Sequence, residues 1–321
     1  MTHARRRFML LATCLGVTAL AGCAAGASGV TSQPASSASA VPSPQGVAVA
    51  AFHALARQEA IHWAKSPLGK VWKTGLVIPS ADDLTSVPST GFSSGNAKLA
   101  FGDGNLVYTG PPPSGAPAGV VTWPDGSTSK VPVLSRAQAF SALKHNGVGR
   151  CQGCKTTPIA VTGARPTTMA VPTSRGTASV PAWEFTVSGV NGPVFQAAIP
   201  PGSYFPVDSV RQPAENLGPL GKAFVGITMA SLSGNDGRAL KMILASSPCG
   251  PAATWGGLVA EVGDVVVVGG WIHDPHPPAA CPGVLIGTRV TVRLAAPLAG
   301  RVILDAATGL PAAPYPFHRG P

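Results

Sequence analysis

Apolar residues recur at helical spacing in two segments of the chain. The first stripe lies between about Val47 and Lys65 and consists of Val49, Phe52, Ala56, Ala60 and Trp63. Intervals of three and four residues are typical of one face of an amphipathic helix, and Pro67 is expected to end it. A second helix is predicted from Ser135 to Lys144, because Ser135 and Gln138 have capping-box spacing. We expect both stripes to face a hydrophobic core.

Most of the remaining chain alternates short β-branched or aromatic runs with turns that contain glycine, aspartate or asparagine. The predicted strand pairs are 98–101 with 106–109, 120–123 with 130–134, 182–188 with 193–198, 223–232 with 239–245, and 258–261 with 265–269, and further runs lie at 288–294 and 301–305. Such turns between such runs are the strongest short-range hairpin signal. The pattern therefore predicts a mainly β fold, an antiparallel sandwich or open barrel rich in hairpins. One or two short helices would give its N-terminal part an α+β character.

The first 22 residues have the features of an export signal. Arg5, Arg6 and Arg7 precede an uncharged stretch of 15 residues, Phe8–Gly22, which is short for a stable membrane span. The sequence Leu20-Ala21-Gly22-Cys23 resembles the bacterial lipobox. This resemblance implies that the leader 1–22 is cleaved and that a diacylglycerol is attached to the thiol of Cys23. The arginine run also looks like a twin-arginine signal, so the export route stays open between that pathway and the general one.

The lipobox sets the expected organisation of the rest of the chain. Residues 23–45 would comprise the lipidated cysteine and a disordered tether rich in Ser, Ala and Pro, with no charge and no apolar residue larger than valine. A flexible tether of this length reaches roughly 25 Å. The folded body then divides into a strand-rich α+β region, 46–215, and a β-rich region, 216–321, with a weak boundary near Pro213–Pro219. The expected location is the extracytoplasmic face of the cell membrane.

Charge narrows the range of partners. Charged residues make up 11% of the chain, against a typical share of about 25%, which argues against a coiled coil or a highly charged disordered chain. Loss of the three leader arginines lowers the formal net charge from +10 to +7. Lys and Arg do not cluster among aromatic residues, so nucleic acid is not an expected partner. The expected partners are the membrane, through the lipid, and a cell-wall polymer or another envelope protein.

Four cysteines remain after the leader is removed and Cys23 is lipidated: Cys151, Cys154, Cys249 and Cys281. An even number in an oxidising compartment predicts disulfides, and three pairings are possible. The favoured pairing is Cys151–Cys154 with Cys249–Cys281. A C-x-x-C redox site needs its first thiolate at a helix N-terminus after a strand, whereas Lys155–Pro158 shows no helical pattern. A zinc site of four cysteines would need a second C-x-x-C motif, which positions 249 and 281 do not supply.

Other polar groups have weaker chemical patterns. Glu261 and Asp264 resemble a carboxylate pair, but their positions at a turn do not establish the geometry of glycoside hydrolysis. The segment Trp271–His276 has metal-capable side chains at no standard spacing, and we expect it to be a solvated loop. Glu184 is expected to face water, and His62 to be partly buried on the first helix. The sequence lacks the nucleophile-elbow, phosphate-loop, zinc-protease and dinucleotide-binding motifs, so no catalytic, cofactor or metal residue is assigned.

Several short runs together resemble uncharacterised exported lipoproteins of high-GC Gram-positive bacteria. They are the lipobox with its tether, Cys151-Gln152-Gly153-Cys154, Val171–Gly176 with Val180–Trp183, Pro297-Leu298 and Arg301–Asp305. The resemblance covers most of the mature chain, and it implies a location and no activity. We therefore expect a lipid-anchored, non-catalytic binding or interaction module of the envelope. The alternative is an extracytoplasmic enzyme, either a thiol-disulfide oxidoreductase using Cys151 and Cys154 or a hydrolase without a recognisable motif.

The two expected disulfides differ in loop length, and this difference generates a prediction. Cys249–Cys281 closes a long loop, worth roughly 3–4 kcal/mol in loop-closure entropy, whereas Cys151–Cys154 closes a ring worth only about 2 kcal/mol before strain. Cys249→Ser should therefore lower the melting temperature more than Cys151→Ser does. Non-reducing peptide mapping must first establish the pairing, and free thiols or crossed bridges would contradict the scheme. A Cys154→Ser variant that keeps its stability but loses thiol-exchange activity would favour the enzyme alternative.

Overall fold

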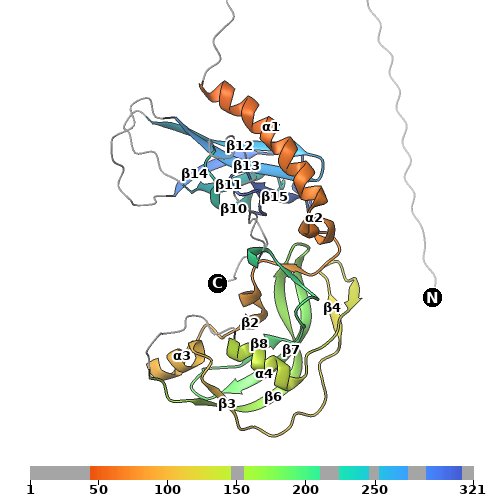
Figure 1. Ribbon diagram of the computed structural model, residues 1–321, viewed down its shortest axis with the longest axis vertical. Coiled ribbons are helices and arrows are strands. Elements are labelled where there is room, and N and C mark those ends of the chain that lie inside the picture. Colours follow the sequence, from red (N-terminus) through yellow and green to blue (C-terminus); the bar gives the residue numbers. More distant parts are fainter. Residues whose placement is uncertain (1–43, 146–154, 210–223, 246–252, 274–286, 313–321) are drawn as a thin grey trace, which may run out of the picture. The chain divides into compact units, whose positions relative to one another are not determined.

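The computed structural model describes residues 44–145, 155–209, 224–245, 253–273 and 287–312. Within these residues the protein is mainly β, with a few helices (Figure 1). The helices are α1 (Pro44–Lys65), α2 (Pro67–Val71), α3 (Gly95–Gly102) and α4 (Arg136–His145), with 3-10 turns at Ala81–Leu84 and Val207–Ser209. The predicted leader, the tether up to residue 43 and all six cysteines lie outside the described residues, as does the predicted boundary at Pro213–Pro219.

The first group of strands forms one curled sheet and a short separate pair. The strands are β1 (Val77–Ile78), β2 (Thr85–Ser86), β3 (Leu106–Tyr108), β4 (Val120–Thr122), β5 (Thr128–Lys130), β6 (Ile159–Thr173), β7 (Gly176–Val187), β8 (Val194–Ala197) and β9 (Phe205–Pro206). The sheet order is β2-β8-β7-β4-β5, and β6 pairs with both β7 and β3, whereas β1 pairs with β9. The long β6–β7 hairpin is the spine of this sheet (Figure 1).

Strand β7 buries side chains on both faces of the curled sheet. Ala178, Val180 and Ala182 contribute to one cluster, which also contains Trp123. Alternate positions farther along the strand, including Trp183, contribute to a second cluster beneath α3 and α4. Because consecutive side chains of a strand point to opposite faces, two cores form on one strand.

The second group of strands forms two three-stranded sheets. The strands are β10 (Ile227–Ser233), β11 (Ala239–Leu244), β12 (Thr254–Val262), β13 (Val265–His273), β14 (Thr288–Arg293) and β15 (Val302–Asp305). One sheet has the order β10-β11-β14 and the other β12-β13-β15. Leu240, Val266 and Ile303 share a cluster, so the two sheets pack face to face. The packing is a small sandwich.

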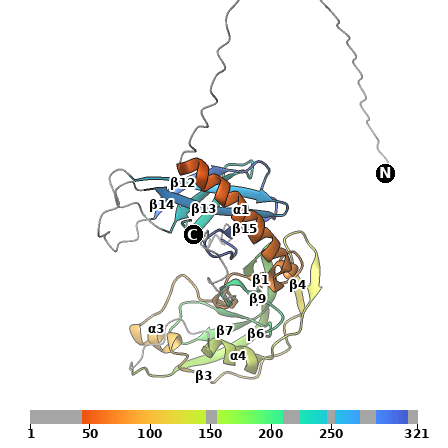
Figure 2. The ribbon, with the colours of Figure 1, turned by 45° about the horizontal axis from the view of Figure 1, so that its top comes forward.

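Helix α1 covers the other face of the β12-β13-β15 sheet. Phe52 and Trp63 belong to one cluster with Val267 and Leu304, and both views show α1 lying along β12 and β13 (Figures 1 and 2). The order of layers is therefore α1, then β12-β13-β15, then β10-β11-β14. Among the described residues, none of the helices is both long enough and apolar enough to cross a membrane.

Most of the predicted elements are confirmed. Helix α1 includes the predicted stripe, and Ser66 caps α2, whose first residue is Pro67. Helix α4 is preceded by the predicted capping box, in which Ser135 N donates to Gln138 Oε1 (2.9 Å) and Gln138 N donates to Ser135 Oγ (3.4 Å). The hairpins β7–β8, β10–β11 and β12–β13 are antiparallel as predicted. The β4–β5 hairpin also forms, but its second strand is 128–130 and not the predicted 130–134.

One strand assignment is wrong. Residues 98–101 are helical, because Ser94 Oγ caps the first turn of α3 by accepting a hydrogen bond from Ala97 N. Strand β3 consequently pairs in parallel with β6 instead of closing a hairpin. The predicted runs 288–294 and 301–305 are strands, and β14 pairs with β11, whereas β15 pairs in parallel with β13. Parallel pairing joins segments distant in sequence, and no turn motif announces it.

Candidate functional site

The outer face of the β10-β11-β14 sheet has no covering layer among the described elements. Its side chains form cross-strand rows, because the strands pair in register. One row contains Met229, Ile243 and Arg289, and the next contains Ser231, Lys241 and Thr291. Met229 is 55% exposed, which is high for a side chain of its size and polarity. None of the described elements therefore blocks a ligand from this sheet face.

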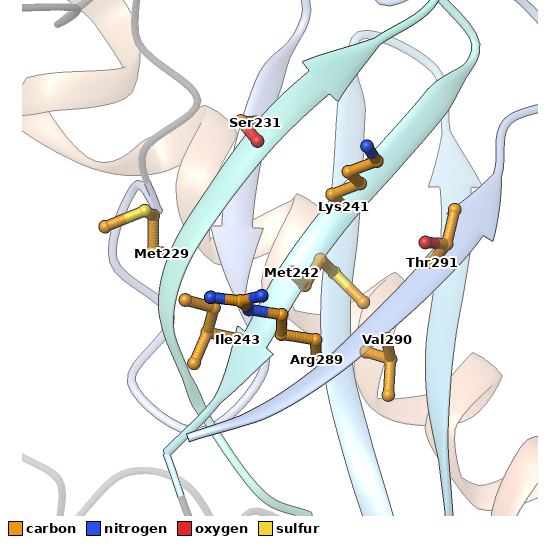
Figure 3. A pocket seen from close by; sticks show the side chains of 8 residues that line it. All are labelled: Met229, Ser231, Lys241, Met242, Ile243, Arg289, Val290 and Thr291. Atoms are coloured by element: carbon orange, nitrogen blue, oxygen red, sulfur yellow. The ribbon is translucent and has the colours of Figure 1, made fainter. Parts of the chain in front are cut away.

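A groove of about 410 Å³ lies on this face. It is lined by Met229, Ser231, Lys241, Met242, Ile243, Arg289, Val290 and Thr291. Its volume is within the usual range of small-molecule sites, which is about 300–1,000 Å³. Figure 3 shows the side chain of Arg289 extending from β14 over Ile243.

The groove carries two cations without an acidic partner among the described residues. The ion pairs of the described chain involve Lys73, Arg165, Arg175, Arg293 and Arg301, and neither Lys241 nor Arg289 takes part. The nearby Arg293 differs, since its Nη2 lies 2.8 Å from Asp236 Oδ2. Hydrogen bonds from the Arg238 amide and from Arg293 hold the pKa of Asp236 below its ordinary value. The groove is thus positively charged.

The groove offers charge, hydroxyl groups and apolar surface. Its outward-facing side chains supply two cations, two hydroxyl groups and the apolar surface of Met229 and Ile243, whereas Met242 and Val290 face the inner sheet. None of the eight lining residues is a carboxylate or an imidazole, the common general bases that could activate the hydroxyl groups of Ser231 and Thr291. The arrangement suits an anionic ligand that also has an apolar part.

The groove residues were not singled out by any sequence motif. Alternation in β11 and β14 was a usable signal, because Lys241 and Arg289 are exposed between apolar residues that face the core. Which face stays open, however, depends on how the two sheets stack. The cysteines Cys23, Cys151, Cys154, Cys249 and Cys281, which were the residues assigned from the sequence, lie outside the described residues.

The structure separates Glu261 from Asp264. Arg301 Nη1 lies 2.6 Å from Glu261 Oε2, and the amide of Ala295 donates to Glu261 Oε1 at 2.5 Å. Asp264 instead pairs with Lys73 at 2.5 Å. Burial raises the pKa of Glu261, but these hydrogen bonds outweigh it and leave the pKa below its ordinary value. Each carboxylate is therefore engaged in its own structural contact.

The remaining polar candidates lie apart from one another. His62 is exposed on α1, which contradicts the expected partial burial, because the helix turns Trp63 inward instead. Glu184 lies opposite the aromatic face, as expected, but its side chain is only 14% exposed and pairs with Arg165 at 2.7 Å. The expected loop Trp271–His276 is wrong for residues 271–273, which are the last residues of β13, and residues 274–276 lie outside the described residues.

Two buried carboxyl groups lie outside the groove. Glu59 on α1 is 2% exposed, and burial raises its pKa although the charge of His62 opposes the shift. Burial also raises the pKa of Asp305, which accepts hydrogen bonds from the amides of Ile227 and Ala307 and thereby fixes a turn. Within the described segments, no three His, Cys, Asp or Glu side chains cluster as metal ligands would.

Comparisons with models of protein families, with curated proteins and with solved structures find no match to this chain. The groove and its chemistry are therefore the basis on which a function can be proposed.

The contacts of Glu261 generate a prediction for stability against pH. Glu261→Gln should cost about 1–2 kcal/mol at neutral pH, because hydrogen bonds to a charged group are lost. A carboxyl whose pKa is lower in the folded state stabilises the fold above its unfolded pKa of about 4.3, and this stabilisation disappears as the pH falls through the folded value. Urea unfolding should therefore show a gap between wild type and variant that closes below about pH 4.

The matched control is Asp264→Asn, which removes the exposed partner of Lys73 at the same turn. Its effect should be smaller, because both side chains of that pair are solvated. An equal loss in the two variants, or a gap for Glu261→Gln that persists in acid, would contradict the structural role assigned to Glu261.

Proposed function

We propose that this protein is a lipid-anchored binding module on the extracytoplasmic face of the membrane, and that the groove on β10-β11-β14 holds its ligand. The observation that carries the binding role is a pair of cations, Lys241 and Arg289, which have no acidic partner in the described part of the chain and lie beside exposed apolar side chains. The lipobox resemblance at Leu20–Cys23 supports the anchor. A membrane tether would keep such a module near its ligand while the envelope is assembled or remodelled.

A binding role accounts for the groove better than catalysis does. Cations and hydroxyl groups orient an anion, whereas the eight lining residues offer no carboxylate or imidazole to activate the hydroxyl of Ser231 or Thr291 as a nucleophile. The groove is also open and shallow enough that water reaches its side chains, as the exposure of Met229 illustrates. Enzymes usually exclude water from the reacting atoms.

The anchor has a direct test in cells. Cys23→Ala should move the protein from the membrane fraction to the medium, or leave the leader uncleaved, because the lipid can no longer be attached. Fractionation and intact-mass measurement of the product report both outcomes. A Cys23→Ala chain that is still processed and still bound to the membrane would contradict lipid anchoring.

The ligand site can be tested before the ligand is identified. A chain without residues 1–22 contains three methionines, Met169, Met229 and Met242. Met229 is exposed in the groove, whereas Met242 borders the groove but is buried between the two sheets, and Met169 is buried in the core of the curled sheet. The chain from residue 23, with Cys23→Ser, keeps the whole compact unit Pro42–Pro321 and can be labelled with ¹³C at the methionine methyl groups.

Envelope extracts of an actinobacterial host should then shift the methyl signal of Met229 and leave that of Met169 unchanged. A Ser231→Trp variant, which fills the groove from an accessible strand position, should abolish the shift. Extracts that move none of the three signals, or that move Met169 as much as Met229, would overturn the groove as the ligand site.

A further inference from the structure

Two cations of the groove lie diagonally on neighbouring strands. Lys241 on β11 is paired in register with Thr291 on β14, and Arg289 lies two residues before Thr291 on the same strand. Such diagonal positions are about 7–8 Å apart in an antiparallel sheet, and both side chains are long. Figure 3 shows their charged ends apart, with that of Arg289 over Ile243. Both side chains are long enough to turn toward a single anionic group, with the hydroxyl of Thr291 as an additional donor.

An apolar strip adjoins this cationic corner. Met229 and Ile243 are paired in register across β10 and β11, and Arg289 continues the same row. Methionine adapts its shape to an irregular apolar surface, and contact with an alkyl chain would remove that surface from water. A small hydrated anion would leave the strip exposed. The groove is thus amphiphilic, with its charge at one corner and its apolar surface beside it.

Other occupants fit this face less well. A symmetric contact with a second copy would bring Lys241 and Arg289 against the same two cations in a chain whose formal net charge is still +7 without the leader. A protein partner usually contacts about 20–30 residues on each side, against the eight that line the groove. A polyanionic polymer would need a row of available cations, and the next cation on β14, Arg293, is already paired with Asp236.

We propose that the ligand of the groove is an anionic amphiphile, in which a phosphate or carboxylate group lies between Lys241 and Arg289 and an alkyl chain lies on Met229 and Ile243. This inference rests on the proposed function, since it names the class of ligand for the same site. Both parts of the ligand contribute to binding. Its anionic group fixes its position on β14, and its alkyl chain lies along the apolar strip toward β10.

Three probes separate the two contributions in the methyl-labelled chain. They are dodecyl phosphate, inorganic phosphate and dodecyl maltoside, each used below any micellar concentration. Dodecyl phosphate should shift Met229 saturably, without Met169, and bind at least about tenfold more tightly than either of the others, because only it uses both the charge and the strip. Raising the salt concentration should weaken this binding, since the cations are exposed.

Single substitutions test which side chains of the groove bind dodecyl phosphate. Lys241→Gln and Arg289→Gln should each weaken dodecyl phosphate about five- to tenfold, because each removes a charged hydrogen-bond donor. The matched control is Arg293→Gln, on the same strand and face but already ion-paired, and it should change the affinity less than about twofold. Ile243→Thr should weaken binding while keeping its salt dependence, since it alters only the apolar strip.

Each contrary result has a definite meaning. If dodecyl maltoside binds as tightly as dodecyl phosphate, charge plays no part. If inorganic phosphate binds as tightly as dodecyl phosphate, the alkyl chain plays no part. Either result overturns the proposal of an anionic amphiphile. An effect of Arg293→Gln as large as that of Arg289→Gln would indicate general charge attraction and overturn the site. If envelope extracts shift Met229 but dodecyl phosphate does not, the ligand class is wrong and the proposed function stands. If neither shifts it, both fall.

Discussion

The run Val265–Gly270 in β13 is the constraint on which the second group of strands depends. All six residues are buried, although alternate side chains of a strand point to opposite faces. A strand that is apolar on both faces has to be covered on both, so α1 packs on one side and the β10-β11-β14 sheet on the other. The outer sheet has no such double requirement, because β11 alternates buried and accessible residues. Its accessible face, and with it the groove, is the direct consequence.

Glycines set how closely the two sheets approach. Gly257 and Gly270 are cross-strand partners in β12 and β13. A Cβ at Gly257 would lie 2.7 Å from Val292 Cγ1, and one at Gly270 would lie 2.5 Å from Leu244 Cδ2. Side chains of β11 and β14 therefore rest directly on the backbone of the inner sheet, which holds the strands that carry Lys241 and Arg289 against a rigid support. The glycines weaken their own strands but permit this close packing.

The sequence predicts local structure well and long-range pairing poorly, for a physical reason. The Ser135–Gln138 capping box and the Asn191-Gly192 turn act within a few residues, and both are confirmed. The parallel pair β13–β15 has no local signal, and the helix at residues 98–101 depends on a cap outside the run that looked like a strand. The long strand β6 contains Gly163 and Pro166, and because both residue types are unusual inside strands, its sequence does not indicate a strand. The groove was missed for the same reason, since its two cations are far apart in sequence and meet only through strand register.

The surplus of basic over acidic residues bears on how the positions of Lys241 and Arg289 are interpreted. The chain has 23 Lys and Arg residues but 13 Asp and Glu residues, so many cations have no acid available. Several ion pairs of the described residues join segments that are distant in sequence, such as Arg175 to Asp125 and Arg301 to Glu261. These cations therefore have a structural role in the fold. An unpaired cation in open water is ordinary and implies nothing. Lys241 and Arg289 differ because they share one groove with exposed apolar side chains, a combination that neither solubility nor folding requires.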